Sequence, residues 1–144
     1  MTLIRKTILQ RFSNKSIVSG LWLRDYANTP LFPNCFLHVL PVKEYPYFKY
    51  YMKGIALVTV GEAGLWMQGT TEERIQYSLD FEEKSGGKNT ADWSVLSRLE
   101  TELLAEYRKY FPYTVRGIVN YRFTLNEQQA VIGHLNKKYI DGLK

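Results

Sequence analysis

The chain has 144 residues, of which 45% are hydrophobic and 23% are charged. These values are typical of a folded globular protein and argue against a long disordered chain. The length is that of one domain, so we expect a single domain over residues 1–144 with a core of its own. The net charge is +5 at pH 7, which leaves open partners of acidic character.

The chain shows no sign of a membrane segment. Its apolar runs fall short of the ~20 residues that a bilayer span needs. The N-terminus, Met1 to Lys6, lacks the succession of charged, apolar and small residues that marks a signal peptide. The lone cysteine, Cys35, has no partner for an internal disulfide. We therefore expect a protein made in a reducing compartment, the cytoplasm.

Charge is segregated along the chain. Residues 1–53 hold eight Lys or Arg against two acids, a net charge of +6. Residues 54–106 hold four against ten, which gives −6, and residues 107–144 hold seven against two, which gives +5. Blocks of opposite charge can hold one fold together, or they can form unlike faces through which copies of the chain meet.

The first half predicts one helix and two strands. Apolar residues at helical spacing predict a helix over Leu3–Phe12. Residues 35–42 read as a strand that Pro41 confines to an edge or an end of a sheet. The β-branched run Ile55–Val60 predicts a strand buried on both faces, and Glu62–Thr71 follows it as a glycine-bearing loop.

A strict alternation of polar and apolar residues runs from Arg74 to Glu82. With a period of two, the apolar members share one face of a strand; they are Ile75, Tyr77, Leu79 and Phe81. We therefore predict a half-buried strand beside Ile55–Val60.

The second half predicts a helix, a strand and a helix. Leucines and tyrosines at helical spacing predict a helix over Trp93–Tyr110, which Pro112 ends. Tyr113–Phe123 alternates and predicts a strand with a basic outer face. Asn126 and Gln129 resemble a capping box ahead of a helix over Glu127–Ile140. The order predicts an α+β fold: a mostly antiparallel sheet of about four strands, an N-terminal helix, a central helix packed on the sheet and a C-terminal helix.

Catalytic patterns are sparse. Asp80-x-Glu82-x-Lys84, with Glu62 upstream, resembles the acidic strand positions and lysine of metal-dependent nucleases. The same spacing also arises on any solvated strand, which is the interpretation that we favour. Cys35 and His38 lack a second pair of zinc ligands, so no metal, cofactor or enzymatic activity is expected.

Aromatic and basic residues crowd into one short segment. It comprises Tyr45, Tyr47, Phe48, Lys49, Tyr50, Tyr51 and Lys53. Such a run can stack nucleic-acid bases and bind phosphates, aided by Arg116 and Arg122 on the predicted strand. Alternatively, its tyrosines pack at the edge of a core or at a subunit interface. A small basic nucleic-acid-binding domain is therefore our second functional hypothesis, and a metal-dependent nuclease is the third.

Other residues predict contacts with protein partners. Leu65, Trp66 and Met67 are large apolar residues on the predicted loop, a position typical of a contact site. Two acidic faces are candidates to meet the basic face of Arg116 and Arg122 in a neighbouring copy. They are the strand face of Asp80 and Glu82 and the helix face of Glu100, Glu102 and Glu106.

The order of these elements resembles the tail terminator proteins of long-tailed bacteriophages. That family has an opening helix, a strand ending in a Gly or acidic turn, a long loop, an alternating strand, a helix and a closing strand. The matching pieces here are Leu3–Phe12, Ile55–Val60 with Gly61-Glu62, the loop to Thr71, Arg74–Glu82, Trp93–Tyr110 and Val115–Phe123.

The resemblance implies a structural virion protein without catalytic activity. Such a protein forms a ring, typically of six copies, that caps the tail tube and meets the connector or neck proteins. The implied location is the virion, assembled in the host cytoplasm. A ring of this kind closes by head-to-tail contacts, which need two different complementary surfaces on each subunit.

Overall fold

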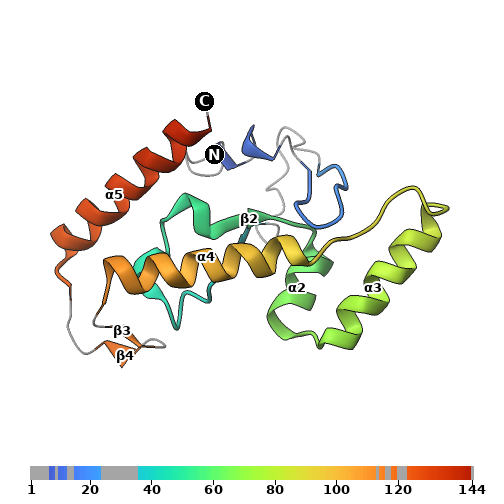
Figure 1. The fold of residues 1–144 in the computed structure, drawn as a ribbon, viewed down its shortest axis with the longest axis horizontal. Coiled ribbons are helices and arrows are strands. Elements are labelled where there is room, and N and C mark those ends of the chain that lie inside the picture. The colour runs from blue at the N-terminus through green and yellow to red at the C-terminus, as the bar shows by residue number, and fades with distance from the viewer. Residues whose placement is uncertain are drawn as a thin grey trace. The chain divides into compact units, whose positions relative to one another are not determined.

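The computed structural model describes residues 7–8, 10–12, 15–23, 36–112, 114–115, 118–119 and 123–143. Helices predominate in this part of the chain (Figure 1). The α-helices are α2 (Val60–Gln68), α3 (Thr71–Lys84), α4 (Ser94–Tyr110) and α5 (Leu125–Gly142), and residues 7–8 and 10–11 are also helical. Two short 3₁₀ helices are η2 (Pro46–Phe48) and η3 (Met52–Gly54).

The strands are short and form two separate pairs. β1 (Phe36–His38) pairs with β2 (Ile55–Leu57). β3 (Thr114–Val115) pairs antiparallel with β4 (Ile118–Val119), with Thr114 opposite Val119. The predicted four-stranded antiparallel sheet is therefore wrong. Within the predicted strand over residues 113–123, the described residues include two strands of two residues each, β3 and β4. The predicted strand over residues 55–60 ends at Leu57, and Val60 already begins α2.

Local capping explains where the helices begin. A threonine precedes each of the helices α2, α3 and α5, and a glutamate follows it three positions later. The threonine hydroxyl accepts a hydrogen bond from the glutamate N–H, and the glutamate carboxylate accepts one from the threonine N–H. The pairs are Thr59 with Glu62, Thr70 with Glu73, and Thr124 with Glu127. These reciprocal bonds satisfy N–H groups that a helix start leaves unpaired. The box predicted at Asn126 and Gln129 is thus wrong by two residues.

The chain divides into two compact units. Unit 1 comprises residues 1–37 and 56–97, and unit 2 comprises residues 38–55 and 98–144. In unit 1, α2 and α3 pack side by side as a helical hairpin (Figure 1). In unit 2, α5 packs against η2 and η3. The prediction of one domain over the whole chain stays a prediction.

Each unit has buried apolar residues of its own. In unit 1 they include Ile8, Val18, Leu57, Val58 and Leu96. In unit 2 they include Phe48, Leu103, Tyr107, Phe111 and Leu135. None of the helices described in the structure combines the length and the apolar character that a bilayer span requires.

Gly69 lies at the tight connection between α2 and α3. A Cβ atom built at this position would come within 2.6 Å of the carbonyl oxygen of Leu65. Only glycine allows the backbone to turn this closely, because any other residue would press its Cβ into the last turn of α2. The hairpin of unit 1 therefore depends on this glycine.

Candidate functional site

Among the residues that the structure describes, Glu62, the third residue of α2, is the buried charged one. Its side chain has no solvent exposure, although carboxylates are seldom fully buried without partners. The Thr59 N–H donates to its Oε1 at 2.9 Å. The start of a helix also favours a negative charge, because the helix dipole is positive there. Glu62 was predicted to begin a loop, and this is wrong, because it lies in the first turn of α2.

Two hydroxyl groups complete the environment of this carboxylate. Ser16 Oγ donates to Glu62 Oε1 at 2.5 Å, and Tyr77 Oη donates to Oε2 at 2.7 Å. Ser16 Oγ itself accepts the N–H groups of Val18 and Ser19. The Glu62 carboxylate thus joins the turn at residues 16–19, α2 and α3 into one hydrogen-bonded cluster, which we call the Glu62 cluster.

Burial and the bond to Glu62 both affect Tyr77. Burial is the larger cause and the hydrogen bond to Glu62 the next, and together they raise the pKa of Tyr77 to about 12. The phenol therefore stays a donor at every physiological pH. Ser16 is buried and its hydroxyl is committed to Glu62, so the cluster serves to position α2 and α3 rather than to attack a substrate.

The guanidinium of Arg74 holds the other end of the helical hairpin. Its Nε donates to the carbonyl of Leu65 at 3.0 Å, and its Nη2 donates to the carbonyls of Trp66 and Gly69 at 3.0 and 3.1 Å. These carbonyls belong to the C-terminal turn of α2, where a cation also suits the helix dipole. The Arg74 guanidinium lies 5.3 Å from the centre of the Trp66 ring. The hairpin is therefore fixed at both ends.

Helix α3 carries apolar residues on two sides. Tyr77 and Phe81 are partly buried, whereas Ile75 and Leu79 are 54% and 55% exposed. Ile75 and Leu79 are four residues apart, so they lie next to each other on the outer face of the helix.

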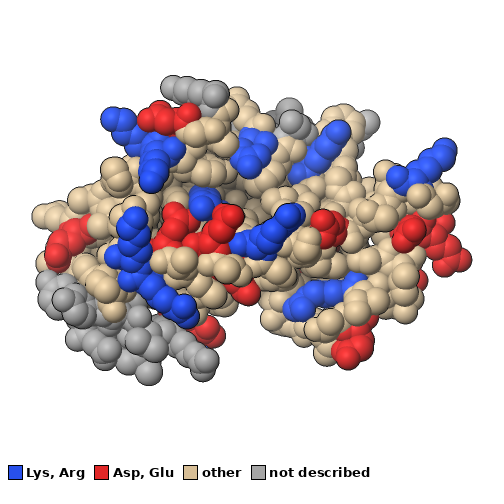
Figure 2. Space-filling model, in the orientation of Figure 1, with Lys and Arg blue, Asp and Glu red and all other residues tan. Residues whose placement is uncertain are grey.

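Acidic residues border the exposed pair. At 100° per residue, Glu72, Glu82 and Glu83 each lie within about 90° of both Ile75 and Leu79 around the helix axis. We call these five residues the α3 stripe. Figure 2 shows acidic side chains over α3, which has five acids, Glu72, Glu73, Asp80, Glu82 and Glu83, against Arg74 and Lys84. The stripe is thus an apolar pair inside an acidic margin.

The alternating segment 74–82 was predicted to be a strand, and this is wrong. On a helix, Asp80 and Glu82 are about 200° apart, so they do not share the face that a nuclease-type metal site requires. The described residues contain no group of three or more His, Cys, Asp or Glu side chains able to hold a metal ion. Cys35 lies outside the described residues, and His38 Nε2 lies 3.0 Å from the carbonyl oxygen of Lys49.

The residues predicted to form an apolar contact loop lie on α2. Leu65 and Trp66 are partly buried, while Met67 is 63% exposed. The loop prediction for residues 62–71 is therefore wrong, because the capping box of Thr59 and Glu62 starts a helix there. Met67 alone of the three offers most of its side chain to solvent.

The aromatic and basic segment of residues 45–53 packs mainly into unit 2. Phe48 and Tyr51 are buried. The Tyr47 ring lies 4.7 Å from that of Phe111, the Phe48 ring 4.8 Å from that of Tyr107, and the Tyr45 ring 5.1 Å from that of Tyr107. These contacts make the segment part of a core, the alternative to base stacking. Tyr50, which is 61% exposed, and Lys49 remain at the surface.

Two of the predicted interface acids have partners within the same unit. The Lys53 ammonium lies 2.7 Å from Glu106 Oε1 and 3.3 Å from Glu102 Oε2. Tyr51 Oη donates to Glu106 Oε2 at 2.8 Å. Burial, followed by this bond, raises the pKa of Tyr51. Glu100 is partly exposed on the same helix, α4, and Arg116 and Arg122 lie outside the described residues.

The Glu62 cluster and the α3 stripe did not emerge from the sequence as sites. The signal for the first was the pair Thr59-x-x-Glu62, a capping-box pattern that predicts a helix start. For the second it was the spacing of four between Ile75 and Leu79, which fits a helix as well as a strand. The chain matches no family model, and we found no similar protein among curated sequences or solved structures.

Proposed function

We propose that this protein is a non-enzymatic structural protein that assembles with copies of itself through the α3 stripe. The observation that carries the proposal is the exposure of Ile75 and Leu79, adjacent apolar side chains on a helix whose position is fixed by buried hydrogen bonds. Large apolar side chains gathered on a rigid surface are typical of contact sites. Burying both in an interface would contribute about 2–3 kcal/mol, since about half of each side chain is still in water.

The acidic margin of the stripe favours a basic partner surface, and unit 2 has one to offer. Among the described residues of unit 2, the exposed basic ones are Lys43, Lys49, Arg98, Arg108, Lys109, Lys137 and Lys138. Contact between an acidic, apolar surface of one copy and a basic surface of the next is heterologous, and repeated contacts of this kind close into rings when the rotation allows. Opposite charges would also set the orientation of the copies.

The narrower form of the proposal is a tail terminator or neck component of a phage virion, forming a ring at the end of the tail tube. The helix over Trp93–Tyr110 supports it. Two other elements of the resemblance differ, because the alternating strand is helix α3 and the long loop contains helix α2. The proposal of a ring therefore rests more on the α3 stripe and the segregated charges than on the order of elements.

Nucleic-acid binding is the second candidate, and its support is the exposed pair Lys49 and Tyr50 with the basic residues of unit 2. Against it, most rings of residues 45–53 pack inward and are unable to stack on bases. Binding to single-stranded DNA that weakens steeply with salt would favour this candidate.

Light scattering coupled to size-exclusion chromatography tests the assembly. In a variant carrying Ile75→Ser and Leu79→Ser, we expect self-association to weaken at least tenfold, with an unchanged circular dichroism spectrum. The matched control is Leu125→Ser, which removes a leucine that is 66% exposed at the start of α5. Equal effects of the control and the double variant would contradict the role of the α3 stripe.

A further inference from the structure

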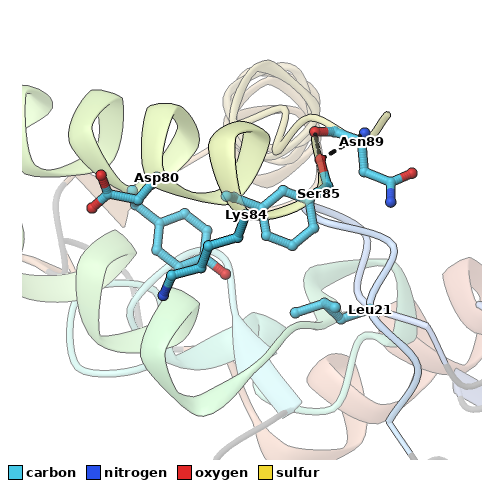
Figure 3. A pocket seen from close by; sticks show the side chains of 7 residues that line it. Leu21, Asp80, Lys84, Ser85 and Asn89 are labelled. Atoms are coloured by element: carbon cyan, nitrogen blue, oxygen red, sulfur yellow. Dashed lines mark hydrogen bonds between the residues drawn. The ribbon is translucent and has the colours of Figure 1, made fainter. Parts of the chain in front are cut away.

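A pocket of about 510 Å³ lies in unit 1 (Figure 3). At 100° per residue, its lining residues on α3 lie on the side of the helix away from Ile75 and Leu79. This volume is within the range of sites that bind small molecules. The pocket is lined by Leu21, Tyr77, Asp80, Phe81, Lys84, Ser85 and Asn89. Neither the sequence patterns nor the assembly proposal gives this pocket a role.

The middle of the pocket is apolar and aromatic. The rings of Tyr77 and Phe81 are nearly parallel, at 11° with centroids 6.3 Å apart. Leu21 lies across the pocket from α3 (Figure 3). Tyr77 is held in place, because its hydroxyl donates to Glu62. Aromatic side chains and a leucine present a surface suited to a flat ring.

Polar groups lie at the two ends of the pocket. Asp80 and Lys84, one helical turn apart, are at one end, and Asn89 is at the other (Figure 3). Asp80 and Lys84 carry opposite charges, and Asp80 Oδ1 accepts the side-chain N–H of Gln76 at 2.8 Å, which leaves Oδ2 for a ligand. At the far end, Ser85 Oγ donates to the carbonyl of Asn89 at 3.1 Å and accepts the Asn89 N–H at 3.0 Å, which fixes the position of Asn89.

We propose that this pocket binds an aromatic α-amino acid that carries a ring hydroxyl, with L-tyrosine as the simplest example. The ring lies between Leu21 and the aromatic residues of α3. The ligand carboxylate pairs with Lys84, and its ammonium pairs with Asp80. The phenol hydroxyl bonds to the side-chain amide of Asn89.

This assignment uses both charged side chains of the lining, Asp80 and Lys84. A ligand with only a carboxylate would leave Asp80 opposed to it, and a ligand with only an ammonium would leave Lys84 opposed to it. A zwitterion satisfies both. An aliphatic amino acid would leave the aromatic wall and Asn89 without partners.

The experiment is a titration of the full chain with L-tyrosine, followed by the amide resonances in NMR spectra. We expect saturable shifts at Leu21, Phe81, Lys84 and Asn89. Phenylalanine, tyramine and deaminated tyrosine, which lack the hydroxyl, the carboxylate and the ammonium respectively, should each bind about tenfold more weakly, the effect of losing one good polar contact.

Variants identify the contacts one by one. Lys84→Gln should weaken tyrosine about tenfold and leave tyramine unchanged. Asp80→Asn should spare deaminated tyrosine, and Asn89→Ala should spare phenylalanine. The matched control is Lys88→Gln, because Lys88 is an exposed lysine next to Asn89 that does not line the pocket. Absence of saturable shifts with tyrosine, or equal losses for all ligands in each variant, would overturn the proposal.

Discussion

Replacing Glu62 with alanine tests whether its buried carboxylate fixes the helical hairpin of unit 1. The change leaves three donors without their acceptor: the Ser16 hydroxyl, the Thr59 N–H and the Tyr77 hydroxyl. Leaving a buried donor unsatisfied costs about 1–3 kcal/mol, so three such donors cost about 3–5 kcal/mol even after partial relaxation. We therefore expect the free energy of unfolding to fall by about that amount, a large share of the ~5–15 kcal/mol of a typical domain.

Glu73→Ala is the matched control, because Glu73 occupies the same position in the capping box of α3 but is exposed. There, water replaces the lost bond to Thr70, and we expect a loss of about 0.5–1 kcal/mol. Urea unfolding followed by circular dichroism measures both values. A Glu62→Ala loss within about 1 kcal/mol of the control would refute the idea that this carboxylate holds the hairpin together.

The remaining predictions concern single contacts. Tyr77 has a pKa of about 12 in the folded protein against 10.0 unperturbed, so its neutral form stabilises the fold below pH 10, and this contribution is lost as the pH rises from 10 to 12. In Tyr77→Phe, the free energy of unfolding should therefore fall less steeply over that pH range. An unchanged slope would contradict the bond to Glu62. Glu106→Ala should destabilise unit 2 by about 1–3 kcal/mol in urea titrations, because Tyr51 and Lys53 both lose a partner. The control is Glu102→Ala, at an exposed position. An equal loss in the control would contradict the role of the Glu106 contacts with Tyr51 and Lys53. Gly69→Ala should destabilise the chain in the same assay, since its Cβ would meet the Leu65 carbonyl; a neutral change would disprove the close approach.

The sequence was sufficient to predict the longest helices. The spacing of leucines and tyrosines predicted residues 93–110, and α4 is Ser94–Tyr110. The C-terminal helix was predicted over residues 127–140, and α5 is Leu125–Gly142. In both, apolar residues recur at intervals of three and four along one face, which is the helical period.

The segment 74–82 shows why the sheet was predicted wrongly. Its apolar residues alternate, but Ile75 with Leu79 and Tyr77 with Phe81 are also spaced by four, as on a helix. The capping box of Thr70 and Glu73 and the helix-favouring Glu, Gln and Lys residues decide between the two periods. A strand would have placed all four apolar residues on one face, whereas the helix divides them between an inner and an outer side.

The site could be predicted only in part, because burial depends on contacts distant in sequence. Glu62 is buried by Ser16, 46 residues earlier, and by Tyr77, 15 residues later. No local pattern carries that information. Likewise, the aromatic residues of 45–53 are covered by Tyr107 and Phe111 of unit 2, so their inward position follows from packing and not from their composition.

Native mass spectrometry of the unmodified protein over a range of concentrations tests the central claim most directly. Assembly through the α3 stripe predicts a closed oligomer of fixed mass, without nucleic acid, that dissociates on dilution. A chain that remains monomeric at every concentration would contradict it.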